Sequence, residues 1–273
     1  MRLNRYDYLE GIGMNKQNGM MKRIVNIAML LTLGASMSAC AGFLGLGGDS
    51  WKEEVLLHDG SKIIAERSVE RGGRHEIGQK PPYKEQSLSF TMPGTNQTIT
   101  WEDHYSEDIG TASFLPMLLD VYEGSAYIVA NTMGCLSYNK WGRPNPPYVV
   151  FKYEGKEWKR ITLQELPAEI KTPNLIQSEP DAKAKNIRLS PVPSQTIQEI
   201  IARYPQPEFR TILREAMPKG PDCGEMAGNG KGKWVGMGWF RDQPSYEACL
   251  NYCQRENFDA QHCPCSTMFK GAK

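Results

Sequence analysis

Four pairs of β-prone segments, each joined by a short turn signal, constrain the fold of this 273-residue chain more than any other feature. The turn signals are Asp59-Gly60, residues 92–97, Glu123-Gly124 and residues 154–156. Asp-Gly suits a two-residue type I′ turn, in which both residues have positive φ. Segments rich in β-branched and aromatic residues on both sides of such turns are typical of β-hairpins. We therefore predict that residues 51–165 form an antiparallel β domain.

The second pair shows the side-chain alternation of a sheet with one solvated face. Leu88 and Phe90 alternate with serine and threonine, and Ile99 and Trp101 alternate with threonine, which places the apolar residues on one face. The turns recur roughly every thirty residues, but the residues around them do not repeat, and about eight strands would form only about two propeller blades. We expect a sandwich or a small closed barrel in a mainly β, α+β protein.

Residues 166–218 differ in composition from the β domain. Residues 171–193 contain four prolines, which predicts a linker along the surface. Ser194 then has the chemistry of an N-cap, and two apolar stripes at helical spacing follow it. The stripes consist of Ile197, Ile200, Ile201 and Tyr204, and of Phe209, Ile212, Leu213 and Ala216. We predict two short amphipathic helices, each packing one face against the β domain.

Residues 20–39 carry the three parts of a secretory signal peptide. Lys22 and Arg23 precede an apolar stretch, Ile24–Leu33, and small residues lead from there to Cys40. A stretch of this length is too short to span a bilayer, which needs about 20 residues. The segment Met37–Cys40 resembles the lipobox of bacterial lipoproteins, which implies that Cys40 becomes a lipidated N-terminus. Two or more acyl chains would hold the protein stably on a membrane.

The segments on either side of the signal peptide complete this organisation. Residues 1–19 are interpreted as an extension from a start codon assigned too early, and residues 40–50, with four glycines, as a flexible tether. Ala41 follows the cysteine, which in lipoproteins of enteric-type bacteria implies the outer membrane, facing the periplasm. Removing residues 1–39 leaves 27 basic and 29 acidic residues. This near-neutral balance gives no reason to expect a nucleic-acid partner.

Six cysteines follow Cys40, an even number in a chain with an export signal, which predicts disulfides in an oxidising compartment. Five lie in a cysteine-rich tail, residues 219–273. There Cys249 and Cys253 share one face of a helix that starts near Ser245, and Cys263-Pro-Cys265 can fold back onto that face. Fifteen pairings are possible. We favour two bridges between the helix and this loop, and a third from Cys135 to Cys223.

A zinc site is the alternative interpretation of the tail. The last four cysteines and His262 would supply the ligands, but the C-x3-C and C-x-C spacings differ from the C-x2-C pairs of common zinc knuckles. An oxidising compartment also disfavours free thiols. We predict no metal and no cofactor.

The polar cluster most typical of a site is the segment Trp101–Asp108. His104 lies there beside Asp103, Glu107 and Asp108, which offer carboxylates for acid–base catalysis or for a divalent cation. The same composition is typical of a solvated strand end. The chain contains no G-x-S-x-G, H-E-x-x-H or P-loop motif. The hypothesis of a catalytic role therefore rests on this cluster.

Two loops rich in glycine and proline are candidate binding loops, because a sheet scaffold presents such loops to partners. The first, residues 70–82, contains His75. The second carries Tyr138, Trp141 and Arg143, residue types that anchor interfaces or stack on sugars. The alternative is a proline-stiffened loop that covers a sheet edge.

Several segments resemble a group of uncharacterised proteobacterial lipoproteins. They are Trp51–Val55, Arg71–Glu76, Lys84–Phe90, Lys140–Tyr148, Glu165–Pro167 and Phe209–Glu215. The resemblance implies a lipid-anchored protein of the cell envelope and assigns no catalytic residue. Our first hypothesis is a non-enzymatic binding or structural module whose partner is an envelope protein or a glycan. The alternative is a periplasm-facing hydrolase or metal-dependent enzyme that uses the His104 cluster.

Overall fold

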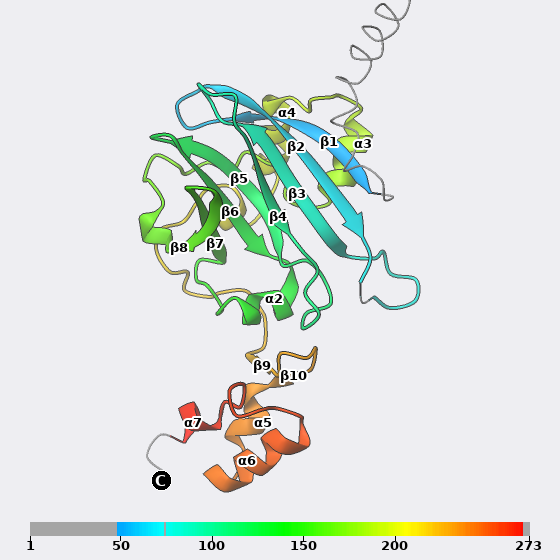
Figure 1. Ribbon diagram of the computed structural model, residues 1–273, viewed down its shortest axis with the longest axis vertical. Coiled ribbons are helices and arrows are strands. Elements are labelled where there is room, and N and C mark those ends of the chain that lie inside the picture. The colour runs from blue at the N-terminus through cyan, green and yellow to red at the C-terminus, as the bar shows by residue number, and fades with distance from the viewer. Residues whose placement is uncertain (1–47, 74, 270–273) are drawn as a thin grey trace, which may run out of the picture. The chain divides into compact units, whose positions relative to one another are not determined.

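The computed structural model describes residues 48–73 and 75–269. Cys40, the signal peptide and residues 1–19 lie outside the described residues. Within them, ten strands form three antiparallel sheets, and the helices are few and short (Figure 1). The fold is therefore mainly β, as expected for an α+β protein. We call residues 48–218 the body and residues 219–269 the tail.

The first sheet of the body contains the two N-terminal hairpins. Its strands, in spatial order, are β1 (Asp49–Leu56), β2 (Lys62–Arg71), β3 (Tyr83–Thr91) and β4 (Thr98–Asp103). The alternation predicted for β3 and β4 is confirmed. Phe90 pairs with Ile99 and Leu88 with Trp101, and all four side chains are buried on one face.

The second sheet contains the other two hairpins. Its strands are β5 (Phe114–Tyr122), β6 (Ser125–Thr132), β7 (Tyr148–Glu154) and β8 (Glu157–Ile161), again in sequence order. The short helix α2 (Gly134–Lys140) lies between β6 and β7, and a 3-10 turn, η1 (Leu163–Glu165), follows β8. The hairpin order keeps every strand next to its neighbour in the sequence, so the sheet needs no crossover connection.

The two sheets face each other across the main hydrophobic core. This core joins residues of the first sheet, such as Val55 and Leu88, to Leu119, Ile128 and Phe151 of the second. The strands of the second sheet are also apolar on their outer face, where the segments around residues 163–170 and 212–213 cover them. A sheet buried on both faces has nearly continuous apolar strands, as β5 and β6 do.

The turn predictions were partly wrong. Asp59-Gly60 does not form a type I′ turn, since only Gly60 has positive φ, at +85°. Leu57 N donates to Ser61 O, which gives a three-residue loop with glycine in the left-handed region. The Asp59 carboxylate accepts from Ser61 N at 2.8 Å, and this local bond favours the wider loop. The type I′ geometry occurs instead at Glu123-Gly124, with φ of +48° and +74°.

Two short helices pack beside β1, and only one of them was predicted. The predicted helix is α4 (Ser194–Ala202), whose Ile197 and Ile201 are buried. Its N-cap is Pro193 rather than Ser194, because the Ser194 hydroxyl donates to Glu54 Oε1 at 2.7 Å. The other helix, α3 (Pro180–Ile187), lies in the segment predicted as a linker, where Pro180 occupies the first turn.

The second predicted helix, over Phe209–Ala216, does not form. Only a 3-10 turn, η2 (Pro207–Phe209), is present. Ile212 N donates to Lys171 O at 2.8 Å, and the Arg214 guanidinium donates to four carbonyl oxygens of residues 163–170. These long-range bonds replace the i to i−4 bonds of a helix, so tertiary contacts override the apolar spacing.

The tail forms a small separate core. Its elements are β9 (Met226–Gly228), β10 (Trp234–Gly236), α5 (Met237–Arg241), α6 (Tyr246–Arg255) and α7 (Cys265–Met268). The expected start of the cysteine helix is confirmed, because Ser245 caps α6 by accepting from Ala248 N at 3.1 Å. Among the described residues, no helix is long and apolar enough to cross a membrane.

Candidate functional site

Asp103 of the His104 cluster faces the interior of the body. Its side chain is 6% exposed and accepts hydrogen bonds from Ser113 N, Phe114 N and Gln86 Nε2. Burial raises the pKa of the Asp103 carboxyl above its usual value, although these hydrogen bonds act in the opposite direction. Asp103 therefore connects the end of β4 to the start of β5, which is a structural role.

The other members of the cluster point in different directions. His104 is 69% exposed, and its Nδ1 lies 2.8 Å from Glu85 Oε2, a contact that raises the pKa of the imidazole. Asp108 accepts from Lys140 Nζ at 2.9 Å, and Glu107 is exposed to solvent. The four residues named from the sequence therefore do not converge on one reacting position.

Trp141 of the candidate binding loop packs into the body instead of facing a partner. Its ring centroid lies 4.6 Å from that of Phe114 and 6.4 Å from that of Phe151, and the Arg160 guanidinium covers its outer side. The indole Nε1 is buried and has no hydrogen-bond partner among the described residues. Trp141 therefore extends the core between the sheets.

Arg143 and Tyr138 join the body to the tail. The Arg143 guanidinium donates to Cys223 O at 2.9 Å and to Gly224 O at 3.1 Å, and it lies over the ring of Tyr138. Tyr138 is itself 4% exposed. The Cys135–Cys223 disulfide and the bond from Trp234 Nε1 to Asp108 O reinforce the same junction. These contacts give the loop a structural role at the junction of body and tail, which neither interpretation of the sequence, a binding loop or a cover over a sheet edge, had predicted.

His75 lies on the loop between β2 and β3 and is exposed. Its Nδ1 is 2.9 Å from Gly73 O, so the ring contacts its own loop. A side chain at Gly73 would lie 2.4 Å from Gly110 O, which shows how closely this loop approaches the segment after His104. Among the described residues, no acid, base or nucleophile is hydrogen-bonded to the His75 side chain.

A cleft that the sequence did not suggest lies where three hairpin turns meet. It has a volume of about 450 Å³ and is formed by the β1–β2, β3–β4 and β5–β6 turns. Its lining residues are Leu57, His58, Asp59, Ser61, Pro93, Val121, Tyr122, Glu123 and Gly124. Clefts of this size are typical of sites for small ligands or single side chains. We call it the His58 cleft.

A buried carboxylate fixes the His58 ring at this cleft. Asp120 is 2% exposed, and its Oδ1 lies 2.7 Å from His58 Nδ1 while its Oδ2 accepts from His58 N at 3.0 Å. Val121 N also donates to Asp120. Because two backbone N–H groups already donate to it, the carboxylate acts as an acceptor, which assigns the proton of the neutral ring to Nδ1.

The His58 and Asp120 pair has the orienting geometry found in catalytic dyads, but among the described residues no hydroxyl or thiol is hydrogen-bonded to His58. Ser61, which lines the cleft, donates its hydroxyl to Asp59 Oδ1. Burial raises the pKa of the Asp120 carboxyl, and the bonds from His58 counteract this. The signal that would have found the pair is Asp120 itself, an acidic residue within the apolar strand β5.

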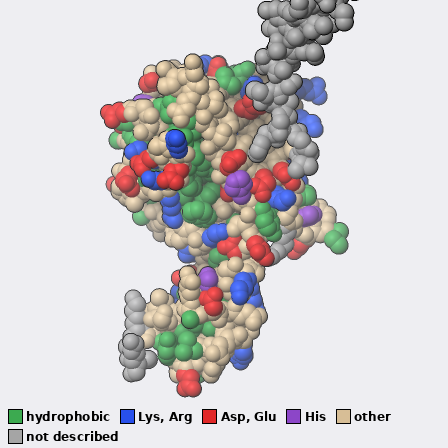
Figure 2. Space-filling model, in the orientation of Figure 1, with side chains coloured by type: hydrophobic (Ala, Val, Ile, Leu, Met, Phe, Trp, Pro, Cys, Tyr) green, Lys and Arg blue, Asp and Glu red, His purple; other side chains and the backbone are tan. Residues whose placement is uncertain are grey.

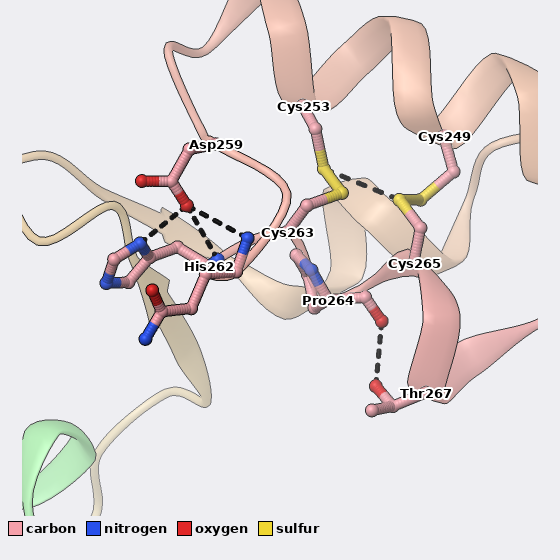
Figure 3. The surroundings of a disulfide bond; sticks show 9 residues. Cys249, Cys253, Asp259, His262, Cys263, Pro264, Cys265 and Thr267 are labelled. Atoms are coloured by element: carbon pink, nitrogen blue, oxygen red, sulfur yellow. Dashed lines mark hydrogen bonds and ion pairs between the residues drawn. A yellow bond between two sulfur atoms is a disulfide. The ribbon is translucent and has the colours of Figure 1, made fainter.

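The five tail cysteines and Cys135 of the body form three disulfides, which agree with the predicted Cys135–Cys223 bridge and with the two predicted bridges from the cysteine helix, whose pairing the sequence had left open. Cys249 pairs with Cys265 and Cys253 with Cys263, and Figure 3 shows the two bridges side by side between α6 and the following loop. His262 turns toward Asp259, with Nδ1 2.7 Å from the carboxylate. In residues 48–73 and 75–269 only Cys253, Cys263 and Cys265 come close enough to share a metal, and all three sulfurs are in disulfides.

Comparisons with known proteins do not add a family to this description. The chain matches no protein-family model, no curated protein and no solved structure.

Proposed function

We propose that the protein is a lipid-anchored protein of the bacterial cell envelope, attached through Cys40 to the outer membrane on its periplasmic side. The observation that carries this proposal is the cystine content: all six cysteines after Cys40 are paired in three disulfides. Structural disulfides persist in the periplasm and are rare in the cytosol. The export signal and the lipobox-like segment before Cys40 agree with that location.

The proposal includes a role in binding rather than in catalysis. The His104 cluster does not converge on one position, and at the His58 cleft the Ser61 hydroxyl donates to Asp59 and not to the oriented imidazole. A rigid scaffold with a preformed cleft suits a binding module. On the face drawn in Figure 2, acidic and basic side chains are interspersed over the body. A nucleic-acid partner needs a clustered basic surface, so the proposal does not include one.

Fatty-acid labelling of growing cells tests the anchor. Cells that express the full chain are fed labelled palmitate, and the protein is recovered by immunoprecipitation. We expect label in the wild type and in Cys223→Ser, and none in Cys40→Ser, because only Cys40 would carry the lipid. Cys223→Ser is the matched control, since it also removes one thiol. Equal labelling of the wild type and Cys40→Ser would contradict the proposal.

A further inference from the structure

We propose that the His58 cleft holds the side chain of an arginine or lysine from a partner protein. This inference rests on the proposed role as a binding module and assigns a ligand class to that role. Three properties of the cleft carry it: its charge, its hydrogen-bonding groups and the apolar part of its lining.

The charge of the cleft is negative. Asp59 and Glu123 line it, and no lysine or arginine does. Hydrogen bonds from the Ser61 side chain and backbone hold the pKa of Asp59 below its usual value, so this carboxylate stays ionised. The charges of Glu169, which lies outside the lining, and of Glu123 also raise the pKa of Tyr122 above its usual value. A cationic group is therefore favoured over an anion.

The polar groups of the cleft are mainly acceptors. Asp120 occupies Nδ1 of His58, and no described residue bonds to Nε2, which is an acceptor when the ring carries its single proton on Nδ1. The Asp59 and Glu123 carboxylates are also acceptors. A guanidinium or ammonium group brings only donors, five in arginine and three in lysine. The hydrogen-bonding match therefore agrees with the charge match.

Aromatic rings add a further preference for a cation. The rings of His58 and Tyr122 lie 5.3 Å apart at an angle of 45°. Asp120 holds His58 through one hydrogen bond with the ring Nδ1 and one with the backbone N. A cation over a tyrosine ring gains electrostatic attraction from the face of the ring. Because the wall is already fixed, binding would not need to order it.

The apolar part of the lining favours a protein side chain over an amino sugar. Leu57, Pro93 and Val121 line the cleft beside the polar groups. Arginine and lysine carry a stem of methylene groups that packs on such surface while the charged head reaches the carboxylates. An amino sugar has a charged group but no comparable apolar stem. The occupant that fits both parts of the cleft is a basic side chain.

Titration of the full-length lipoprotein in mild detergent tests this inference by NMR. The probe is a blocked Gly-Gly-Arg-Gly-Gly peptide, and its control carries citrulline, a neutral isostere of arginine, in place of arginine. We expect the arginine peptide to shift the amide signals of Asp59 and Glu123, and to bind about three- to tenfold more tightly than the citrulline peptide, as two partly exposed ion pairs would.

Two variants make the test specific to the cleft. Glu123→Gln, at an exposed turn, should weaken the arginine peptide about three- to fivefold, as expected for a partly exposed ion pair. Glu157→Gln, at the β7–β8 turn, should leave the binding of the arginine peptide unchanged.

Equal binding of the arginine and citrulline peptides, or no effect of Glu123→Gln, would overturn the inference. So would tighter binding of a glucosamine trisaccharide than of the arginine peptide. Palmitate labelling at Cys40 is independent of all these outcomes, so each proposal fails separately.

Discussion

The body and the tail are stabilised in different ways. The body buries two apolar clusters on the two faces of its second sheet, and its single cysteine, Cys135, bonds only to the tail. The tail buries seven residues in its core, and four of them are cysteines in two disulfides. The chain thus combines a core built from packed sheets with a core built around cystines.

The difference follows from size. A segment of about 50 residues buries a smaller fraction of its surface than a larger domain does, and small exported domains commonly use disulfides in compensation. The tail has two short β-strands and no helix longer than α6 among its described residues. Its covalent links restrict the unfolded chain, whereas the body relies on the area that its sheets bury. The two regions should therefore respond differently to reduction and to charge changes.

The largest effect is expected when the two tail disulfides are removed together. Replacing Cys249, Cys253, Cys263 and Cys265 by serine should unfold the tail and leave the body folded, since each bridge contributes about 2 to 5 kcal/mol. Hydrogen exchange of the full chain, read by mass spectrometry, checks this. Amides of α6 should lose protection while those of β3 and β5 keep it.

A matched control removes the remaining bridge. Replacing Cys135 and Cys223 by serine loosens the junction between body and tail but leaves both tail disulfides in place. Protection of α6 should then persist. If α6 stays protected in the fourfold variant as well, the tail core does not depend on its cystines, and the contrast between the two regions disappears.

A somewhat smaller effect is expected from breaking a buried ion pair in the body. Arg67 donates to Glu53 Oε1 at 2.9 Å, and the two side chains are 3% and 0% exposed. Arg67→Met leaves the Glu53 carboxyl buried without its cation, which should lower the free energy of unfolding of the body by about 3 to 5 kcal/mol. Urea unfolding, followed by the fluorescence of the body's tryptophans, measures this loss.

The double variant Arg67→Met with Glu53→Gln gives the control for that measurement. It removes both charges, so it should recover part of the loss. Protection of α6 in the tail should be the same in all three proteins. A double variant no more stable than Arg67→Met would show that packing, and not the unpaired charge, causes the loss.

The smallest effect is a pH-dependent one at Glu54. Its hydrogen bond with Lys62, followed by those with Ser194, lowers the pKa of Glu54 from its usual 4.5 to about 2. A carboxyl whose pKa is depressed in the folded state adds stability above its unfolded pKa, and this stability is lost as the pH falls from about 4.5 to about 2. Glu54 is 27% exposed, so solvent screening limits its contribution to about 1 kcal/mol.

Glu54→Gln should therefore lower the stability of the body by about 1 kcal/mol at pH 7 and by nearly nothing at pH 2. Urea unfolding at both pH values measures the difference. The control is Glu157→Gln on the exposed β7–β8 turn, whose effect should be within about 0.5 kcal/mol at either pH. A difference between wild type and Glu54→Gln that stays constant with pH would contradict this account of the carboxyl.

The hairpins could be predicted because their signals are local. Alternation along β3 and β4 and the turn at Glu123-Gly124 act between residues close in the sequence, and the structure confirms both hairpins. The spacing of Cys249 and Cys253 likewise placed both thiols on one face of α6. These predictions needed no knowledge of distant parts of the chain.

The failures have a common origin in distant partners. The segment after Pro207 has helical spacing, but Lys171 and the carbonyl groups that Arg214 binds hold it in another conformation. Trp141 and Arg143 are residue types common in binding loops. In the structure, Trp141 packs against Phe114, and Arg143 donates to Cys223 O. A residue type specifies what a side chain can bind, but not which partner the folded chain places beside it.

By itself, the sequence determined the local geometry of this protein: the hairpins and the helix that carries two cysteines. Only the tertiary structure decided which side chains remain available for function. It brought His58 to Asp120, 62 residues away, and formed a cleft from three separate turns. The physical reason is that hydrogen bonding and periodicity act between near neighbours, whereas burial and the competition for partners depend on the whole fold.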